Sequence, residues 1–192
     1  MESLVRESLQ DVASSLADMS ARFVEPVGKC VEETAATLKN GGTIFFCGNG
    51  GSTSAASHIA NDLSCHTRNW NREGYRCICL NDSTAVLTSL TNDYGFECVY
   101  SRPLETLGKP GDILWAYSTS GNSGNVVRAV EAARKKGIKT VAFTGRGGGK
   151  LKDMCDIWVG VNNDDVTRVE ELHLIYSHGI ALGVKAAVSP MQ

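Results

Sequence analysis

The amino-acid sequence predicts an α/β fold in which helices cover both faces of a parallel β-sheet. Three observations support this prediction: five short apolar runs, stretches with helical periodicity between them, and glycine-rich turns where several of the runs end. Apolar runs are typical of strands buried on both faces, and strands that alternate with helices pair in parallel through right-handed crossovers. We therefore expect one three-layer domain with a five-stranded sheet. The expected strands are residues 43–47, 75–80, 112–117, 139–144 and 156–161.

Residues 1–39 precede the first strand and are expected to form two helices. Apolar side chains recur there at helical spacing, and Asn40 with the two glycines after it ends the second helix. This segment has no strand of its own to cover. We therefore expect a helical extension, used in oligomerisation, of a single domain that spans residues 1–192. Later helices are expected at about 53–65, 83–91, 125–136 and 167–187.

The composition of the chain excludes several classes of protein. Its 192 residues carry a net charge of -2, which gives no general attraction to nucleic acid or to anionic membranes. The seven cysteines are an odd number, set mostly in apolar runs, and the first residues begin an amphipathic helix rather than a signal peptide. No apolar run approaches the roughly 20 residues needed to span a bilayer. We therefore expect a cytoplasmic protein with reduced thiols.

Two polar loops follow apolar strands and have the composition of a phosphate site. Gly48-Asn-Gly-Gly-Ser52 follows the first strand, and Ser118-Thr-Ser-Gly-Asn-Ser123 follows the third. Ligands bind beyond the carboxyl ends of parallel strands, where glycines let backbone N–H groups approach and hydroxyls add further donors. Each loop alone could be a flexible turn with a helix N-cap, but two of them favour a terminal phosphate. Neither is a nucleotide motif, since the GxxxxGK[ST] and GxGxxG patterns are missing.

Ionisable side chains gather on two of the expected helices. His58 and Asp62 are four residues apart and share a helix face, while Glu170 and His178 are about two turns apart on the final helix. Two histidines with two carboxylates could bind Zn²⁺, or could act directly as base and acid. For any one of these residues a solvated helix face is the simpler interpretation. We expect His173 to be such a residue, or a partly buried structural histidine.

Five motifs together have an order and spacing that cover essentially the whole chain. They are Cys47-Gly-Asn-Gly-Gly-Ser52 with His58 behind it, Asn92-Asp-Tyr-Gly-Phe96, the Ser118–Ser123 loop, Thr144-Gly with Gly147-Gly-Gly149, and Arg168-Val-Glu-Glu-Leu-His173 leading to His178. In this order they resemble the sedoheptulose 7-phosphate isomerase (phosphoheptose isomerase) family. That family has the sugar isomerase, or SIS, fold, which is Rossmann-like.

The resemblance implies an aldose–ketose isomerase that moves a proton between C1 and C2 of an open-chain sugar phosphate through a cis-enediol. It implies conversion of sedoheptulose 7-phosphate to D-glycero-D-manno-heptose 7-phosphate for lipopolysaccharide biosynthesis, by a homotetramer with active sites shared between subunits. Asp62 and His178 would be the catalytic pair, with Glu170 able to take the place of Asp62. A zinc ion would be held by His58, Asp62, Glu170 and His178. The substrate would be bound by Asn49, Gly50, Gly51, Ser52, Asn92, Asp93, Ser118, Thr119, Ser120, Ser123 and Glu170.

The sequence departs from the family pattern within the expected site. The pattern H-x-A-x-E-L becomes His58-Ile-Ala-Asn-Asp62-Leu, and R-I-Q-E-x-H becomes Arg168-Val-Glu-Glu-Leu-His173, so that Glu170 replaces a glutamine. The usual G-R-Y is replaced by Cys65-His66-Thr67. An isomerase of another ketose phosphate and a non-catalytic SIS protein that binds a regulatory partner are therefore alternatives, although the retained histidines count against the second. A sugar-phosphate-sensing regulator usually carries an added DNA-binding domain, for which 192 residues leave no room.

Overall fold

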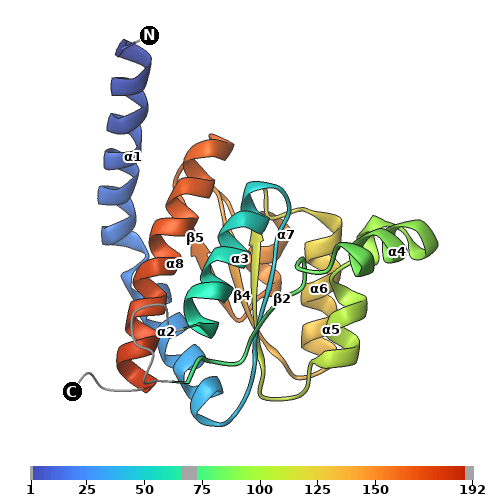
Figure 1. The fold of residues 1–192 in the computed structure, drawn as a ribbon. Helices are drawn as coiled ribbons and strands as arrows, with labels where there is room; N and C mark the ends of the chain where they lie inside the picture. The colour runs from blue at the N-terminus through green and yellow to red at the C-terminus, as the bar shows by residue number, and fades with distance from the viewer. Residues whose placement is uncertain (1, 66–72, 189–192) are drawn as a thin grey trace.

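The computed structural model describes residues 2–65 and 73–188, and it confirms the predicted fold class (Figure 1). The five strands are β1 Ile44–Cys47, β2 Cys77–Cys79, β3 Ile113–Ser118, β4 Lys139–Thr144 and β5 Ile157–Gly160. They form one parallel sheet in the order β2-β1-β3-β4-β5. The chain therefore changes direction across the sheet between β1 and β3. Loops that follow these two strands meet at the position where open parallel sheets bind their ligands.

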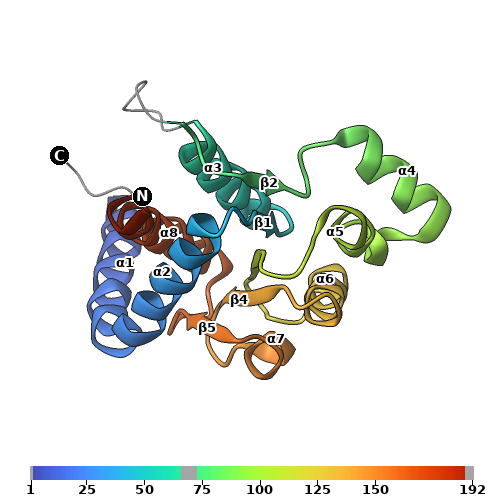
Figure 2. The same cartoon turned by 90° about the horizontal axis from the view of Figure 1, so that it is seen from below.

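Helices cover both faces of this sheet (Figure 2). They are α1 Glu2–Arg22, α2 Val24–Lys39, α3 Gly51–Ser64, α4 Thr84–Tyr94, the 3-10 turn η1 Phe96–Cys98, α5 Ser101–Leu107, α6 Gly124–Lys135, α7 Gly149–Met154 and α8 Val166–Val188. α2, α3 and α8 pack on one face, and α5, α6 and α7 pack on the other. The sequence did not predict α5 and α7, because seven and six residues are too few for a periodic pattern.

Alternation of side chains along each strand fills a core on both faces. Phe46 of β1 is in register with Trp115 of β3, which is in register with Val141 of β4, and all three belong to the core beneath α3 and α8. Phe45 and Leu114 point the opposite way, into the core beneath α6. Burying a large apolar side chain contributes about 1.5–3 kcal/mol. Both helical layers are therefore held tightly, and the carboxyl ends of the strands have fixed positions.

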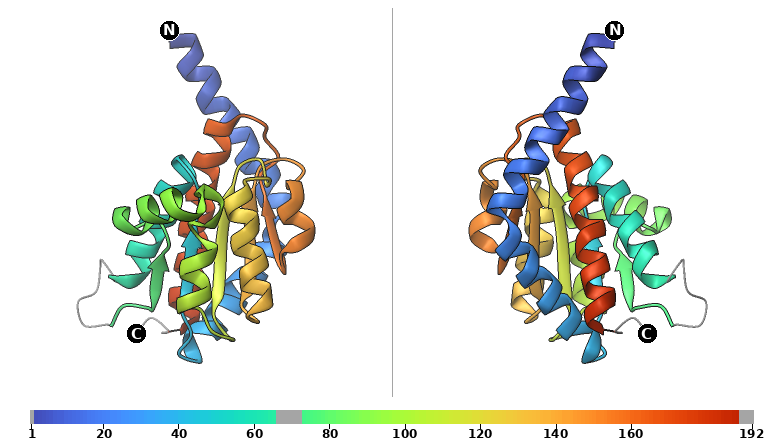
Figure 3. Two further views of the ribbon diagram at one scale, coloured as in Figure 1. Left: turned by 90° about the vertical axis from the view of Figure 1, so that its right-hand side faces the viewer. Right: turned by 90° about the vertical axis from the view of Figure 1, so that its left-hand side faces the viewer.

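The N-terminal extension consists of two helices, as predicted, and α1 projects beyond the body of the domain (Figure 3). The second half of α1 packs on the domain, where Met19 is fully buried and Nδ2 of Asn163 donates to Oγ of Ser15 at 3.1 Å. The first half of α1 leaves three apolar side chains exposed: Leu4, Val5 and Leu9. Of the helices within the described ranges, none combines the length and the apolar character that crossing a membrane requires.

Candidate active site

The loop after β1 is shaped by its glycines and leads directly into α3. Gly50 has a φ of 56°, in the left-handed region that glycine adopts without strain. The carboxyl group of Glu170 on α8 lies against Gly51, because a Cβ built on Gly51 would come within 2.1 Å of Oε2 of Glu170. Ser52, in the first turn of α3, is buried. The structure thus brings Glu170 to the glycine loop at the carboxyl end of the sheet.

The loop after β3 presents the predicted hydroxyl groups. The Oγ atoms of Ser118 and Ser123 are 3.0 Å apart and close the base of the loop. Ser120 is exposed, and its Oγ accepts a hydrogen bond of 3.1 Å from the backbone N–H two residues ahead. Thr119 and Ser120 line a pocket that Arg146 also lines. Arg146 pairs there with Asp164 at 2.9 Å, so the exposed hydroxyls are the groups that the pocket offers to a phosphate.

The glycine-rich segment 147–149 supports the hydroxyl loop from outside. Gly121 in that loop has a φ of 67°, and a Cβ there would stand 2.0 Å from the carbonyl oxygen of Gly148. The N–H of Leu151 donates to the carbonyl oxygen of Gly121 at 3.1 Å. The two backbones therefore touch without any side chain between them. This contact gives a physical reason for the glycine at position 121, and the approach of Gly149 to the carbonyl oxygen of Ser120 gives one for Gly149.

Gly149→Ala should disturb the hydroxyl loop. A Cβ at this position would lie 2.4 Å from the carbonyl oxygen of Ser120, on a backbone whose φ is +54°. We expect a loss of about 2 kcal/mol in the free energy of unfolding and a weaker affinity for sugar phosphate, measured by denaturant titration and calorimetry. Gly147→Ala is the control, since its φ is +83° but no atom lies within 4 Å of its Cβ. Equal losses of phosphate affinity in the two variants would show that the contact does not support the loop.

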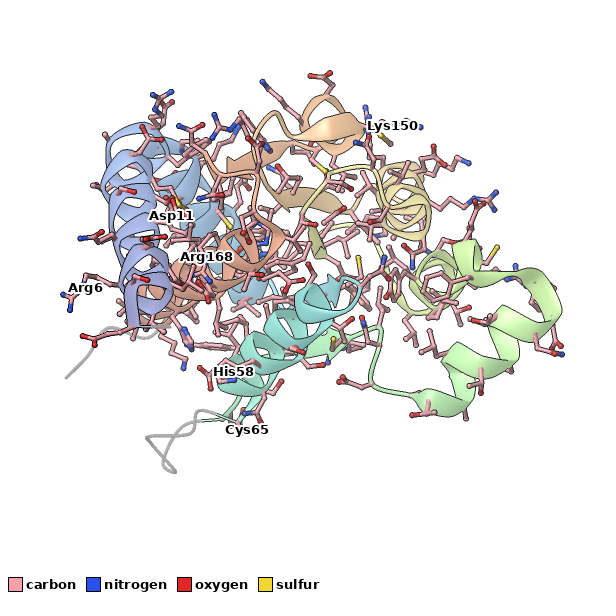
Figure 4. The ribbon with its side chains drawn as sticks, turned by 90° about the horizontal axis from the view of Figure 1, so that it is seen from above. Arg6, Asp11, His58, Cys65, Lys150 and Arg168 are labelled. Atoms are coloured by element: carbon pink, nitrogen blue, oxygen red, sulfur yellow. The ribbon has the colours of Figure 1, made fainter. Side chains whose placement is uncertain are left out.

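α3 and α8 run side by side and bring two histidines and a carboxylate together; Figure 4 labels His58 on α3. Nε2 of His58 and Nε2 of His178 are 3.0 Å apart. Oδ2 of Asp62 lies 3.7 Å from Nε2 of His58 and 3.5 Å from Nε2 of His178. The two histidine side chains are nearly half exposed, at 49% and 43%, so the cluster can be reached from solvent.

This His58–Asp62–His178 cluster fits a zinc-type ion. Within the described residues it is the one group of three or more potential ligands, and its ligand atoms all lie within 4.8 Å of one another. Two imidazole nitrogens and one carboxylate form a donor set that Zn²⁺ accepts, with one position left for a substrate. Glu170, the fourth expected ligand, is not in this group and lies against Gly51 instead.

Asn92 and Asp93, which the resemblance assigns to the substrate, stand apart from the cluster within one chain. They lie near the end of α4, where Nδ2 of Asn92 donates to Oδ1 of Asp93 at 2.8 Å. α4 packs against η1, and Figures 1 and 2 show it at the opposite end of the molecule from α8. A single chain therefore does not bring these two residues to the cluster.

His173 is a structural histidine, one of the two expectations for it, but it is completely rather than partly buried. Its side chain is fully buried, with its ring centroid 5.9 Å from that of Tyr117 and 6.2 Å from that of Phe143. Burial lowers the pKa of His173 to about 4, against a smaller opposing effect of the Thr144 backbone. The cause is the position of His173 on the face of α8 that rests on the sheet. Its ring is neutral near pH 7 and belongs to the core.

Three polar residues around the first loop were not predicted from the sequence: Asn81, Tyr100 and Asn125. They hydrogen-bond to Gly48 or Asn49. Asn81 follows β2 and Asn125 follows the hydroxyl loop, so their positions at strand ends were an available signal. Tyr100 gave no such signal. Of the altered segment Cys65-His66-Thr67, only Cys65 lies within the described residues, where it is exposed at the end of α3.

Comparison with known proteins agrees with this geometry. The SIS domain family matches residues 8–145. A phosphoheptose isomerase of Akkermansia muciniphila is 39% identical over 181 residues, which cover 93% of this chain and 93% of that protein. The structures of phosphoheptose isomerase GmhA from Neisseria gonorrhoeae and of a phosphoheptose isomerase from Francisella tularensis give TM-scores of 0.91 and 0.92 at 32% and 28% identity. Each covers 96% of this chain and 98% of the other. The chain therefore belongs to the phosphoheptose isomerase family of SIS-domain proteins.

Proposed function

We propose that this protein, a sugar-phosphate isomerase by its family, converts sedoheptulose 7-phosphate to D-glycero-D-manno-heptose 7-phosphate. The observation that carries the proposal is the meeting of His58, Asp62 and His178 within 3.0–3.7 Å of one another. The test is incubation of the purified protein with ketose phosphates of different chain lengths, followed by analysis of the products. The seven-carbon substrate should react fastest. Faster turnover of a shorter ketose phosphate would contradict the assignment, and no turnover at all would favour a non-catalytic binding role.

In the proposed reaction the cluster supplies both proton-transfer groups. A carboxylate oxygen of Asp62, or of Glu170 in its place, removes a proton from C1 of the ketose, and the imidazole of His178 gives a proton to the C2 oxygen, which forms the cis-enediol. The carboxyl group then returns its proton to C2 while the imidazole takes the proton of the C1 hydroxyl, which completes the aldose. Oδ2 of Asp62 and Nε2 of His178 are 3.5 Å apart, so the two groups can act on neighbouring atoms of one substrate. Imidazole suits this role because its ring nitrogens can both donate and accept a proton.

For the substrate contacts we propose the two loops. The phosphate would be received by Ser52, Ser118, Thr119, Ser120 and Ser123, and the sugar would lie against Asn49, Gly50, Gly51 and Glu170, with Asn92 and Asp93. The exposed Ser120 and the position of both loops at neighbouring strand ends support this assignment.

We further propose a zinc ion bound by His58, Asp62 and His178, with Glu170 as a fourth ligand. When bound, such an ion polarises the substrate carbonyl and stabilises the negative charge of the enediolate. The exchange of the family's glutamine for Glu170 adds a negative charge, which favours a divalent cation. The donor chemistry of the cluster supports the ion.

A chelator should lower the melting temperature of the purified protein. An ion that binds only the folded state stabilises it by roughly 3 kcal/mol when its concentration is about a hundred times its Kd. The measurement is thermal melting with and without chelator, followed by addition of Zn²⁺. In the control variant His58→Gln the chelator should have little effect, and in Glu170→Gln its effect should be reduced. If the chelator changes neither melting nor activity in the wild type, the metal proposal fails and the cluster acts as a metal-free acid–base group.

We also propose a cytoplasmic homotetramer with shared active sites that serves lipopolysaccharide synthesis. Leu4, Val5 and Leu9 on α1 are 66%, 61% and 65% exposed in the single chain, and Leu182 on α8 is 67% exposed. Large apolar side chains left exposed in this way are typical of surfaces that another subunit covers. A neighbouring subunit would also supply the Asn92 and Asp93 that one chain keeps away from the cluster.

Light scattering on the intact protein should give the mass of four chains. Leu9→Asp places a charge on the exposed apolar face of α1, and we expect it to shift the mass towards smaller species. A monomer at micromolar concentration in the wild type would contradict the shared-site proposal.

A further inference from the structure

We propose that Asn125 and Tyr100 fix the orientation of the Asn49 side chain so that its amide offers a single N–H donor to the substrate. The inference rests on the proposed function, because Asn49 is one of the residues assigned to the sugar. In this view Asn49 touches the substrate, whereas Asn125 and Tyr100 are positioning residues.

Asn49 and Asn125 form a paired ring of two amide groups. Nδ2 of Asn49 donates to Oδ1 of Asn125 at 2.9 Å, and Nδ2 of Asn125 donates to Oδ1 of Asn49 at 2.8 Å. The hydroxyl of Tyr100 lies 2.8 Å from the same Oδ1 of Asn49. A carbonyl oxygen has two lone pairs and an amide nitrogen has two N–H groups. The oxygen of Asn49 is therefore fully used, and in the part of the chain that the structure describes one N–H remains.

The backbone sets which way this amide pair points. The N–H of Val126 donates to Oδ1 of Asn125 at 3.0 Å. An N–H group cannot accept a hydrogen bond, so the amide of Asn125 cannot be reversed without losing this bond. Asn125 is only 3% exposed, so water would not replace the lost partner. Asn49 takes its orientation from Asn125, because each amide must face the other with donor against acceptor.

Tyr100 hydrogen-bonds to the backbone and to a side chain of the loop after β1. Its hydroxyl donates to the carbonyl oxygen of Gly48, 2.6 Å away, and shares that proton with Oδ1 of Asn49. Nδ2 of Asn81 donates to the carbonyl oxygen of Gly48 at 2.8 Å and approaches the Tyr100 hydroxyl at 3.3 Å. Burial raises the pKa of Tyr100 above its ordinary value, so the hydroxyl keeps its proton. The backbone and the side chain of this turn are therefore fixed together.

A lone N–H donor determines what Asn49 can recognise. It pairs with an acceptor oxygen of the sugar, and its bond strengthens as that oxygen gains negative charge. A reversed amide would present its carbonyl oxygen at the same place and would repel such an oxygen. The fixed orientation therefore favours the carbonyl or enediolate oxygen of the substrate over a group that can only donate.

The first test is Asn125→Asp. A carboxylate has the shape of the amide and suits the first turn of α6, where negative charge is favourable, so we expect the variant to fold. The carboxylate cannot donate to Oδ1 of Asn49. The Asn49 amide would therefore reverse, so that its N–H groups face the carboxylate and its oxygen faces the sugar. We expect kcat/KM to fall about tenfold or more at neutral pH. Because the carboxyl group is buried, its ionised form should also lower the melting temperature, so activity is compared at a temperature well below melting.

The pH profile of this variant separates positioning from a structural role. A protonated carboxyl group has one donor and one acceptor and can form the same ring with Asn49. Burial raises the pKa of a carboxyl group, so the activity of Asn125→Asp relative to the wild type should recover as the pH falls. Glu97 lies beside Gly124 at this end of α6 and pairs with Arg128 at 2.6 Å, and both groups are present in both proteins. A relative activity that stays low at every pH would contradict the inference.

The second test compares the removal of a hydroxyl from two buried tyrosines, of which one contacts Asn49 and the other does not. Tyr100→Phe removes the hydroxyl that holds Asn49, whereas Tyr117→Phe removes one that pairs with Ser177 in the core at 2.8 Å. Both residues are almost fully buried, at 2% and 0% exposure, so each variant should lose stability, and Tyr117→Phe shows what the loss of a buried hydroxyl alone does to activity. Only Tyr100→Phe should lower kcat/KM, by about tenfold.

Asn49→Asp distinguishes failure of the inference from failure of the proposed site. It replaces the free N–H by an acceptor, while Asn125 and Tyr100 can still donate to it. If Asn49→Asp keeps wild-type kcat/KM, Asn49 does not donate to the substrate and the proposed site is wrong at this residue. If Asn49→Asp is impaired but Asn125→Asp and Tyr100→Phe behave like Tyr117→Phe, the site stands and the positioning inference is overturned.

Discussion

His178→Asn should lower kcat by about a thousandfold, because it removes the imidazole that is proposed to give a proton to the C2 oxygen. Asp62→Asn should have an effect of the same order, since an amide of equal size cannot take a proton from carbon. Both side chains are partly exposed, at 43% and 23%, so we expect both variants to fold. The measurement is steady-state kinetics on sedoheptulose 7-phosphate.

Two controls accompany these variants. Asp153→Asn makes the same change at an exposed position on α7 and should leave kcat unchanged. Asp62→Glu keeps a carboxylate and restores the length of the family residue, so it should keep much more activity than Asp62→Asn. If both Asp62→Asn and His178→Asn retain wild-type kcat, the cluster is not the acid–base group.

Ser120→Glu should weaken the binding of the sugar phosphate by about a hundredfold or more, because it adds a negative charge a few ångströms from the proposed phosphate position. Ser120 is exposed at the surface of its loop, so the longer side chain has room and the fold should persist. The affinity for sedoheptulose 7-phosphate is measured by calorimetry.

Ser120→Gln is the matched control, since it has the size of glutamate without the charge. Its loss of affinity should be small compared with that of Ser120→Glu, and the difference should shrink at high salt as the charges are screened. An affinity of Ser120→Glu equal to that of the wild type would show that the phosphate binds elsewhere.

Much of the sheet could be predicted from the residues alone. β1 and β3 are wholly buried runs, and such runs are recognisable without knowledge of their partners. The second strand was expected over 75–80 but spans only Cys77–Cys79, because it is an edge strand that pairs with β1 through three residues. Strand length at an edge depends on the neighbour, and the sequence of the strand does not contain that information.

Less of the candidate site than of the sheet could be predicted from the sequence. Spacing places His58 and Asp62 on one helix face, but their meeting with His178 depends on how α3 packs against α8, so the residues alone offered it only as one possibility. The burial of His173 on the same helix has the same origin. The hydrogen bonds that Asn125 and Tyr100 make to Asn49 also arise from tertiary packing, so no local sequence pattern predicts them.

The side-by-side packing of α3 and α8 also has a consequence for folding during synthesis of the chain. The His58–His178 contact joins residues 120 positions apart, with all of β2 to β5 between them. Contacts of such long range form late, because the entropy of closing a long loop must be offset by packing that is already in place. On the ribosome, α3 is made long before α8, so a nascent chain holds Asp62 of the proposed acid–base pair before His178 has been made. Under the proposed mechanism, isomerase activity should therefore be absent until α8 has docked, so that its appearance marks a late stage of folding and assembly.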